Sequence, residues 1–489
     1  MTQAQSSGAS PDGGRADALS GDDHGTLSSV SSGPIFRRIA RQLAEDIRSG
    51  RYNPGDRLPP HRILANQLGV AIATVSRAYA ELSRIGLTSG EQGRGTFVRR
   101  APYRPSTEAI PEPEPSGEID LSINQPAVSP KHDAALNAAL RTLSGDRAVG
   151  TRRNLLSYQP SAGQLQHREA AVRWLEGLGV TVPPDAVVLA SGIQHAVMIA
   201  CAAAFRPGDV LLTEALTNPS FRALASLFRL RIAGVAMDRE GLIPEALERA
   251  CHEHGPTGLY CMPSLQNPTG AVMSEERRAQ IADIAAHHHL TVLENAAYDP
   301  LLPDPPVSLR NLLVDRGVRT FYISALSKVV AAGIRIAYVV PPSDLAPQVA
   351  SAVFATTTMA PQIMAEIASR WIADGTAADL IAWQRAEAVT RRAIVTNRLA
   401  ALVDPKAPAC NHLWLPLPEP WRADQIITLA RRRGLLLAPP ETFTVGQSPT
   451  PQAVRLSLGA AEDHDALAIG AETLSDILEG APLLPYSLT

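Results

Sequence analysis

The sequence is poor in cysteine and contains no long hydrophobic run. Its four cysteines are scattered without a Cys-x-x-Cys pair, which argues against a disulfide framework and against a thiolate zinc site. No uncharged apolar run approaches the roughly 20 residues that a membrane span requires. The first residues lack the basic start and apolar core of a secretory signal, so we expect a cytoplasmic protein with no membrane segment. The cysteines are interpreted as reduced core residues: Cys201, Cys251, Cys261 and Cys410.

Lysine is also scarce, and this scarcity points to one residue. Only Lys131, Lys328 and Lys406 occur among 45 basic residues. Arginine cannot replace a Schiff-base amine because its guanidinium stays protonated, whereas a lysine in partly apolar surroundings can lose its proton. Lys328, within Ser-Ala-Leu-Ser-Lys-Val-Val, is therefore a candidate cofactor anchor. A lone lysine at a strand end is also typical of a surface residue, so its sequence context must decide.

Charge is unevenly distributed along the chain. The formal net charge is −3, but residues 34–100 carry twelve arginines, no lysine and five acidic residues. This stretch is therefore +7, and the rest of the chain is −10. Because arginine neutralises phosphates and releases condensed counterions, the asymmetry favours a nucleic-acid-binding module at residues 34–100.

The length of 489 residues is more than one ordinary hydrophobic core accommodates. Outside residues 34–100, composition divides the chain into three parts. Residues 1–33 are rich in Gly, Ser, Ala and Asp and are predicted to form a disordered tail. Residues 101–118 contain five prolines and are predicted to form a semi-stiff linker. In residues 119–489, strand-like apolar runs alternate with helical stretches, which predicts an α/β domain with a largely parallel sheet.

The basic module has the pattern of a winged helix-turn-helix. Pro34 opens a helix that Gly50 ends, and a short helix around residues 62–68 is followed by Gly69 and another helix. The second of these two helices buries apolar positions at helical spacing, which leaves polar residues near its start that could enter a major groove. Gly-Arg-Gly-Thr at residues 93–96 is typical of a tight hairpin with a basic tip. The groove-facing candidates are Thr74, Ser76 and Arg77.

This module resembles the GntR family of winged-helix regulators over about 65 residues. The resemblance is carried by Arg57-Leu-Pro-Pro-His-Arg62, Leu68-Gly-Val70, Thr74-Val75, Ala78-Tyr79 and Gly93-Arg-Gly-Thr-Phe-Val98. It implies that operator DNA is the partner and that the recognition helix and the wing contact it. The chain departs from many relatives at residues 71–73, where Ala-Ile-Ala removes an expected phosphate contact. The alternative is that the arginines form a solvated face. The candidate DNA-binding residues are His61, Arg62, Thr74, Ser76, Arg77, Arg94 and Thr96.

Several motifs of the large domain follow predicted strands. Ser191-Gly-Ile-Gln-His195 opens an apolar helix, where free backbone N–H groups and a positive dipole end suit a phosphate. Asn267-Pro-Thr-Gly270 and Tyr298 follow two further strands, and Arg335 lies seven residues beyond Lys328. In an open α/β sheet, ligands collect at the carboxyl ends of the strands. The context therefore favours a site around Lys328.

These motifs are similar to those of fold-type I enzymes that use pyridoxal 5'-phosphate (PLP), and nearly everything after residue 34 resembles MocR-type regulators. The resemblance implies an N-terminal winged helix-turn-helix followed by an aminotransferase-like domain with PLP as cofactor. It also implies a large parallel-sheet α/β subdomain and a smaller C-terminal α+β subdomain at about residues 375–489. The residues that carry it are Tyr158, Gly163, Ser191, Gly192, Asn267, Pro268, Tyr298, Ser327, Lys328, Arg335 and Arg455.

The same resemblance implies roles for individual residues. Lys328 would be the Schiff-base lysine, and Asn267 and Tyr298 would hydrogen-bond the phenolic oxygen of PLP. Arg455 would bind the carboxylate of an amino-acid ligand through a bidentate pair. Tyr158 would reach the site of the partner subunit, which implies a homodimer. The cofactor phosphate would be held by Ser191, Gly192, Ile193, Gln194, Ser327 and Arg335.

Three positions depart from the pattern of catalytic relatives. Asn295 stands where those relatives carry the acidic residue that keeps the pyridine nitrogen protonated. Glu294 is adjacent, but strand alternation would direct it elsewhere. Asn218 replaces the aromatic residue that stacks on the ring, and Ala325 replaces a hydroxyl near the phosphate. We therefore expect weak transaminase activity or none, and the departures leave cofactor binding itself open.

The favoured hypothesis is a DNA-binding transcription regulator that responds to PLP and to an amino acid or amine. The alternatives are an active aminotransferase with a DNA-binding appendage, and a DNA-binding protein whose large domain has lost PLP and only dimerises. No metal site is predicted: His287-His-His289 is interpreted as a solvent-exposed cluster, because three consecutive histidines cannot share one face of a helix.

Overall fold

The computed structural model describes residues 35–48, 52, 58–84, 88–91, 95–98, 117–145, 154–446, 448 and 450–480. The chain divides into two compact units, Met1–Pro102 and Tyr103–Thr489. The predicted tail at residues 1–33 lies outside the described residues, as does the predicted linker except for its last two residues. Within the described part of the chain, no helix combines the length and the apolar character needed to cross a bilayer.

The first unit has the predicted winged helix-turn-helix. Gly69 caps the end of α2 in the left-handed conformation with φ 64°, which lets the chain turn into α3. Leu58 N–H donates to the carbonyl of Thr96 at 2.9 Å and so ties the hairpin to the segment before α2. Its elements are α1 (Ile35–Arg48), α2 (His61–Leu68), α3 (Ile72–Arg84) and the antiparallel strands β1 (Thr88–Glu91) and β2 (Gly95–Val98).

The core of this unit follows the helical spacing read from the sequence. The buried residues pack together in one cluster. They lie four apart on α1 and at i, i+3, i+4 and i+7 on α3. The recognition helix α3 is thereby fixed against α1, with its polar positions on the other side. The buried positions of α1 and α3 are Ile39, Ala40, Leu43, Ala44, Val75, Ala78, Tyr79 and Leu82.

A seven-stranded sheet organises the second unit, in the order β4-β12-β11-β10-β9-β5-β6. All neighbours are parallel except β12, which runs antiparallel to both β4 and β11. The carboxyl ends of β9, β10 and β11 therefore lie at one edge, as the sequence motifs require. The strands are β4 (Val188–Ala190), β5 (Val210–Glu214), β6 (Arg231–Val235), β9 (Gly258–Cys261), β10 (Thr291–Asn295), β11 (Thr320–Ala325) and β12 (Ala337–Val340).

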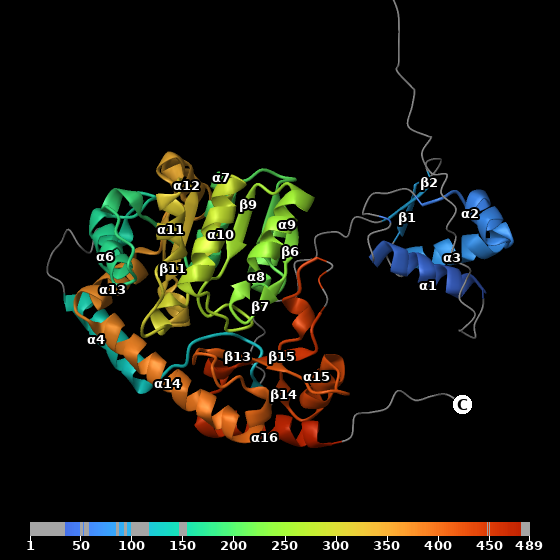
Figure 1. Cartoon of the computed structure of the whole chain (residues 1–489). Helices are drawn as coiled ribbons and strands as arrows, with labels where there is room; N and C mark the ends of the chain where they lie inside the picture. The colour runs from blue at the N-terminus through green and yellow to red at the C-terminus, as the bar shows by residue number, and fades with distance from the viewer. Residues whose placement is uncertain are drawn as a thin grey trace, which may run out of the picture. The chain divides into compact units, whose positions relative to one another are not determined.

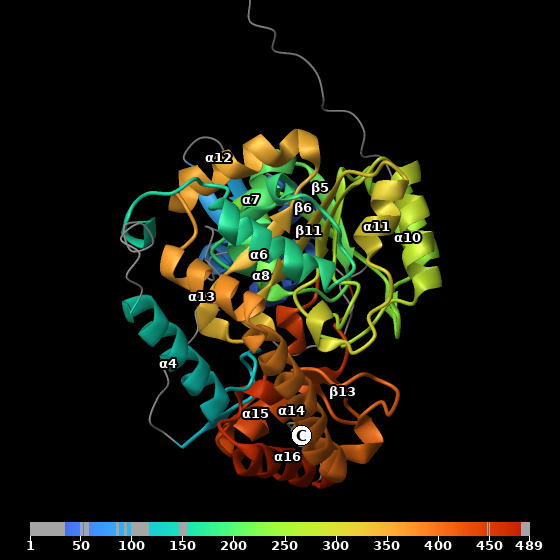
Figure 2. The same ribbon diagram turned by 90° about the vertical axis from the view of Figure 1, so that its left-hand side faces the viewer.

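Helices cover both faces of this sheet, with α10 and α11 on one side in Figure 2. Alternate residues of one strand join different cores: Tyr260 packs with α7 and α8, whereas Leu259 and Cys261 pack under α9 and α10. The helices are α4 (Pro130–Gly145), α6 (Leu165–Glu176), α7 (Ile193–Ala204), α8 (Pro219–Leu227), α9 (Pro244–His254), α10 (Glu275–His287), α11 (Leu309–Asp315), α12 (Ala346–Thr357) and α13 (Gln362–Ala373).

A smaller subdomain gathers at one end of the sheet, and the long helix α14 (Thr376–Leu399) runs from the large core into it (Figure 1). Its first strand comes from far earlier in the chain, because β3 (Ile119–Asp120) pairs in parallel with β14 (Leu435–Leu436). The predicted range of about 375–489 did not include this strand. The other elements are β13 (His412–Pro416), α15 (Ala423–Arg432), β15 (Ala453–Ser457) and α16 (His464–Glu479).

Short elements complete the second unit. A small hairpin joins β7 (Met237–Asp238) and β8 (Gly241–Leu242). The four cysteines are free and buried, as expected from their spacing. The 3-10 helices are η1 (Pro184–Ala186), η2 (Asp299–Leu301), η3 (Leu326–Lys328), η4 (Ala332–Ile334), η5 (Ser343–Leu345), η6 (Ala400–Leu402), η7 (Pro440–Thr442) and η8 (Leu458–Ala460).

Candidate functional site

Lys328 ends η3, directly after β11, where the sheet meets the smaller subdomain. Its Nζ donates to the backbone carbonyl of Asn124 at 2.6 Å, and Asn411 Nδ2 donates to the carbonyl of Lys328 at 2.7 Å. Burial, followed by the charges of Arg455 and Arg335, lowers the pKa of Lys328 to about 8. The amine is therefore far more often neutral at physiological pH than an ordinary lysine, and a neutral amine is a nucleophile.

Tyr298 belongs to a buried network that orients its hydroxyl. His412 Nε2 lies 3.0 Å from the backbone carbonyl of Gln266, and because a carbonyl only accepts, Nε2 carries the imidazole proton. His412 Nδ1 is then the acceptor, and Asn124 Nδ2 donates to it at 3.2 Å. The second N–H of Asn124 donates to the Tyr298 hydroxyl at 3.0 Å. Burial and the nearby Arg455 lower the pKa of His412 to about 3, so the imidazole stays neutral. The hydroxyl proton of Tyr298 thus remains to be donated to a ligand.

Arg455 lies on β15 and reaches the same site from the smaller subdomain. Its Nη1 donates to Asn267 Oδ1 at 3.0 Å, its Nη2 donates to the carbonyl of Ser122, and its guanidinium lies 4.7 Å from the ring centroid of Phe443. The Phe443 ring and the bond to Asn267 hold a planar, permanently charged group in place. Such a group suits a carboxylate.

Ser191 and Gly192 lie between β4 and α7. Arg335 adds a positive charge here, and we call this part of the site the corner around Gly192. Gly192 has φ 87°, and a Cβ at this position would lie 2.5 Å from Arg335 Nη2. Arg335 Nη2 also donates to the carbonyl of Ser191 at 3.5 Å. The Ser191 N–H is already bonded to His195 Nδ1 at 2.9 Å. The absent side chain at Gly192 therefore lets the guanidinium lie over the start of α7.

Two further features at this corner suit an anion. Ser327 is buried, and its Oγ has no hydrogen-bond partner among the described residues. The N–H groups of Ile193 and Gln194 belong to the first turn of α7, where a helix has no intrahelical partner for them. The side chain of Gln194 is exposed and that of Ile193 is buried, so what both residues can offer an anion is the backbone N–H and not the side chain.

Asn295 ends β10 and is 2% exposed. Its Oδ1 accepts from the N–H of Ala297 at 3.2 Å, which identifies the amide oxygen, and its Nδ2 donates to the Tyr260 hydroxyl at 2.7 Å. Nδ2 has a second N–H to offer. Glu294 is directed away from it, as strand alternation predicts: its Oε2 accepts from the N–H of Arg310 at 2.6 Å. Burial and the nearby Asp299 raise the pKa of Glu294 to about 8.

The other two positions that depart from the pattern of catalytic relatives are Asn218 and Ala325. Asn218 caps α8, and its Oδ1 accepts from the N–H of Ser220 at 3.0 Å. Asn218 therefore has a structural role as a helix cap, whereas the sequence indicated only that it replaces a stacking aromatic residue. Ala325 is fully buried at the end of β11. Phe221 of α8 stacks on Tyr260 with centroids 3.8 Å apart, next to the hydroxyl that accepts from Asn295.

The structure brings together most of the predicted cofactor-site residues. Tyr158 is predicted to reach the site of a partner subunit and not this one. Tyr158 is 85% exposed. Sequence reasoning missed Asn124 and His412. Neither belongs to a motif, and Asn124 lies 204 residues from Lys328 and 288 from His412. The only signal for Asn124 was its position just after the predicted linker.

The candidate DNA-binding residues divide into two groups. Arg62 and Arg77 are exposed on α2 and α3. His61 instead links the two helices: its Nδ1 lies 3.0 Å from Ser76 Oγ, and its ring meets Tyr79 edge to face at 4.6 Å. Thr74 and Thr96 are half-buried. Arg94 lies outside the described residues.

Both units match protein-family models. Residues 36–98 match the model described as bacterial regulatory proteins, gntR family, and residues 116–474 match aminotransferase class I and II. The chain is 30% identical over 448 residues to the uncharacterized HTH-type transcriptional regulator YdeF of Bacillus subtilis, a match that covers 91% of this chain and 95% of the relative.

Solved structures similar to this chain include aminotransferases. An archaeal alanine:glyoxylate aminotransferase superposes with a TM-score of 0.67 at 21% identity, covering 83% of this chain and 95% of that one. The α-aminoadipate aminotransferase LysN of Thermus thermophilus, complexed with N-(5'-phosphopyridoxyl)-L-leucine, gives a TM-score of 0.66 at 23% identity, covering 74% and 92%. At these identities the likeness establishes the fold.

Proposed function

Because the chain belongs to the MocR-type transcription regulators, in which a gntR-family domain precedes an aminotransferase class I and II domain, we propose that Lys328 binds PLP and that an amino acid or amine then adjusts operator binding. The observation that carries this proposal is the environment of Lys328. Its amine is bonded to a backbone carbonyl, and burial and two arginines lower its pKa to about 8. A surface lysine has neither feature.

The corner around Gly192 supports the assignment of the phosphate. Arg335 lies over Gly192, the buried Ser327 hydroxyl lacks a described partner, and the first turn of α7 offers N–H groups. A phosphate monoester needs such a set of donors and positive charge. The residues present therefore fit the cofactor at this end.

The residues on the opposite side fit the ring. When bound, PLP supplies an aldehyde that reacts with a primary amine and a ring that withdraws electrons. Tyr298 would donate its proton to the phenolic oxygen, and Asn267 would donate from Nδ2, because its Oδ1 already accepts from Arg455. Asn295 offers an N–H to the ring nitrogen. A neutral amide donates to an unprotonated nitrogen but does not stabilise a pyridinium charge, so the domain is suited to ligand binding more than to turnover.

Arg455 supports an effector with a carboxylate. In the described state its Nη2 bonds to the carbonyl of Ser122. A carboxylate that took both Nη groups would remove this bond, and the cofactor on Lys328 would remove the bond to Asn124. Both released carbonyls lie in residues 119–124, directly after the linker. Ligand occupancy would thus be transmitted to the segment that leads to the DNA-binding unit.

Two further interpretations belong to the proposal. Arg62 and Arg77 would contact operator DNA directly, and Thr74 and Thr96 would lie at the edge of the contact. His61 and Ser76 would position α3 through their mutual contact, in addition to any contact with DNA. The exposed Tyr158 would reach the site of a second subunit, because its ring is 85% exposed and therefore available for such a contact.

The three lysines of the chain allow a direct test. We would incubate the full chain with PLP, reduce with borohydride and identify the modified lysine by peptide mass. Lys328→Ala should abolish the reducible adduct and the absorbance at about 400–430 nm that a lysine-bound cofactor gives. Lys131→Ala and Lys406→Ala are matched controls, since both residues are exposed, and should behave like the parent.

Other results would favour other functions. An unchanged adduct in Lys328→Ala would show that the anchor lies elsewhere. No adduct in the parent would favour a large domain that only dimerises. Rapid multiple-turnover transamination by the parent would favour an aminotransferase with a DNA-binding appendage.

A further inference from the structure

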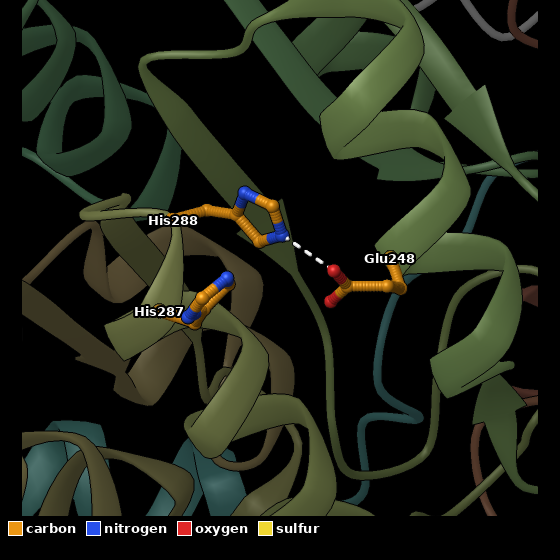
Figure 3. A group of neighbouring side chains, drawn as sticks. All are labelled: Glu248, His287 and His288. Atoms are coloured by element: carbon orange, nitrogen blue, oxygen red, sulfur yellow. Dashed lines mark hydrogen bonds and ion pairs between the residues drawn. The ribbon is translucent and has the colours of Figure 1, made fainter.

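Histidines gather on the large domain at the ends of α9 and α10. Five of the twelve histidines in the chain lie between residues 252 and 289, and three of them surround one carboxylate. His288 Nε2 lies 2.9 Å from Glu248 Oε1, and His252 Nε2 lies 3.1 Å from the same oxygen. One ligand atom each from Glu248, His287 and His288 lies within 4.8 Å of the others. Figure 3 shows both imidazoles turned toward the carboxylate.

The end of α10 explains how two consecutive histidines reach one point. The expectation of no metal at residues 287–289 assumed that these residues continue a helix. Instead α10 ends at His287, His288 is its C-cap with φ −92° and ψ 8°, and His289 takes the left-handed φ of 53°. The chain therefore leaves the helix between the two rings. His287 and His288 pack edge to face with centroids 4.8 Å apart, on the same side as Glu248.

The donor set matches a borderline transition metal. Zn²⁺ is bound in proteins by imidazole nitrogen and carboxylate oxygen at about 2.0–2.2 Å, which places tetrahedral ligands roughly 3.4 Å apart. The Glu248–His288 separation of 2.9 Å is slightly shorter than this, and the other separations reach at most 4.8 Å. Small side-chain rotations would bring all three to a common centre.

We propose that Glu248, His287 and His288 form a Zn²⁺ site that joins α9 to α10, with a water as fourth ligand and His252 positioning the carboxylate. The site is open on one side because His287 is exposed, whereas Glu248 and His288 are half-buried. The four cysteines of the chain are all buried, so no thiolate competes for the metal at the surface. The metal would fasten two helices that cover the same face of the sheet.

This site is separate from the one around Lys328. α9 and α10 precede β9 and β10, so their carboxyl ends lie at the amino edge of these strands. Lys328 follows β11 at the carboxyl edge. Zinc binding and cofactor binding therefore have different residues and independent tests.

Calorimetric titration of the full chain, free of any purification tag, with Zn²⁺ alone would test the proposal. We expect one ion per chain. Loss of an outer-shell partner typically weakens metal affinity by about 10–100-fold, so His288→Ala, which removes a ligand, should weaken it by at least about tenfold. Glu248→Gln and His287→Ala should do the same, and His252→Ala should have a smaller effect. His254→Ala is the matched control, because His254 is an exposed histidine of α9 outside the cluster.

X-ray absorption on the loaded protein provides a second readout. It should show nitrogen and oxygen neighbours at about 2.0–2.1 Å, with imidazole scattering and no sulfur. The proposal is overturned if the parent binds no zinc, or if His288→Ala binds as tightly as His254→Ala, which would indicate adventitious surface binding only. Lys328→Ala should retain zinc binding, so failure of the cofactor proposal would leave this result unchanged.

Discussion

The amine of Lys328 donates a 2.6 Å hydrogen bond to the backbone carbonyl of Asn124, a residue 204 positions earlier in the chain. Asn124 in turn donates to Tyr298, and Arg455 donates to Ser122 two residues before it. The segment that follows the linker is therefore held by side chains to which cofactor and effector binding are assigned. A change in the hydrogen bonding of Lys328 or Arg455 therefore alters the contacts that hold the segment containing Ser122 and Asn124.

Hydrogen exchange should report this coupling. Attachment of PLP to Lys328 removes the donor to the Asn124 carbonyl, so amides of residues 117–124 should exchange several-fold faster after loading. An amino-acid ligand that engages Arg455 should add to the effect. Peptides from β10 are the control, since their ladder is paired on both sides. Equal or slower exchange in residues 117–124 would contradict the proposed route.

Cofactor attachment should depend on pH with a midpoint near 8. The pKa of Lys328 is lowered to about 8 by burial and by Arg455 and Arg335. The neutral amine thus reaches half at about pH 8 and is about nine-tenths complete one unit above it, whereas an ordinary lysine would reach half only at about 10.4. The rate of PLP incorporation, followed by stopped-flow absorbance, should rise and then level off.

The same measurement on Arg455→Gln checks the cause. Removing this positive charge should raise the pKa of Lys328, shift the midpoint to higher pH and slow attachment at pH 7. Arg249→Gln, an exposed arginine of α9, is the control and should leave the profile unchanged. A midpoint that does not move in Arg455→Gln would rule out this charge as a cause.

Asn295→Asp should speed amino-group transfer from a bound amino acid to the cofactor. A carboxylate can still accept from the Ala297 N–H and from the Tyr260 hydroxyl, so the local geometry should survive. Its charge would stabilise a protonated ring nitrogen, and a gain of ~3 kcal/mol is more than a hundredfold in rate. Single-turnover absorbance spectra measure this step.

Two companion variants sharpen the comparison. Tyr260→Phe removes the partner of Asn295 without adding charge and should not accelerate the step. Adding Asn218→Tyr to Asn295→Asp restores a ring for stacking but removes the cap of α8, at a cost of about 1 kcal/mol in stability. If the step is no faster than in the parent with Asn295→Asp alone or with the double change, Asn295 does not limit the chemistry.

DNA affinity should fall steeply with salt, and two arginines should carry part of this dependence. Using a duplex obtained by in vitro selection, Arg62→Ala and Arg77→Ala should each weaken binding and reduce the slope of log affinity against log salt by about one, as expected for a lost phosphate contact. Arg249→Ala on the large domain is the control. A slope unchanged in both variants would place the DNA contacts on other residues.

Local patterns in the sequence were sufficient for the elements and for part of the site. The helical spacing of Val75 and Tyr79 predicted the recognition helix, because one face of a helix must be buried. The scarcity of lysine singled out Lys328 for a chemical reason that does not depend on the fold. The motif at Ser191 predicted a phosphate corner because a helix begins there.

Only the tertiary structure decided which distant residues meet. The strand β3 joins the smaller subdomain by pairing with β14, and this pairing brings Asn124 to Lys328. The orientation of the Asn295 amide depends on the Tyr260 hydroxyl, 35 residues away in the chain. His288 meets Glu248 because α10 ends at His287 and His288 leaves the helical conformation as its C-cap. Periodicity reports burial along one element, whereas these contacts depend on the order of strands in the sheet and on where helices end, which packing of the whole chain determines.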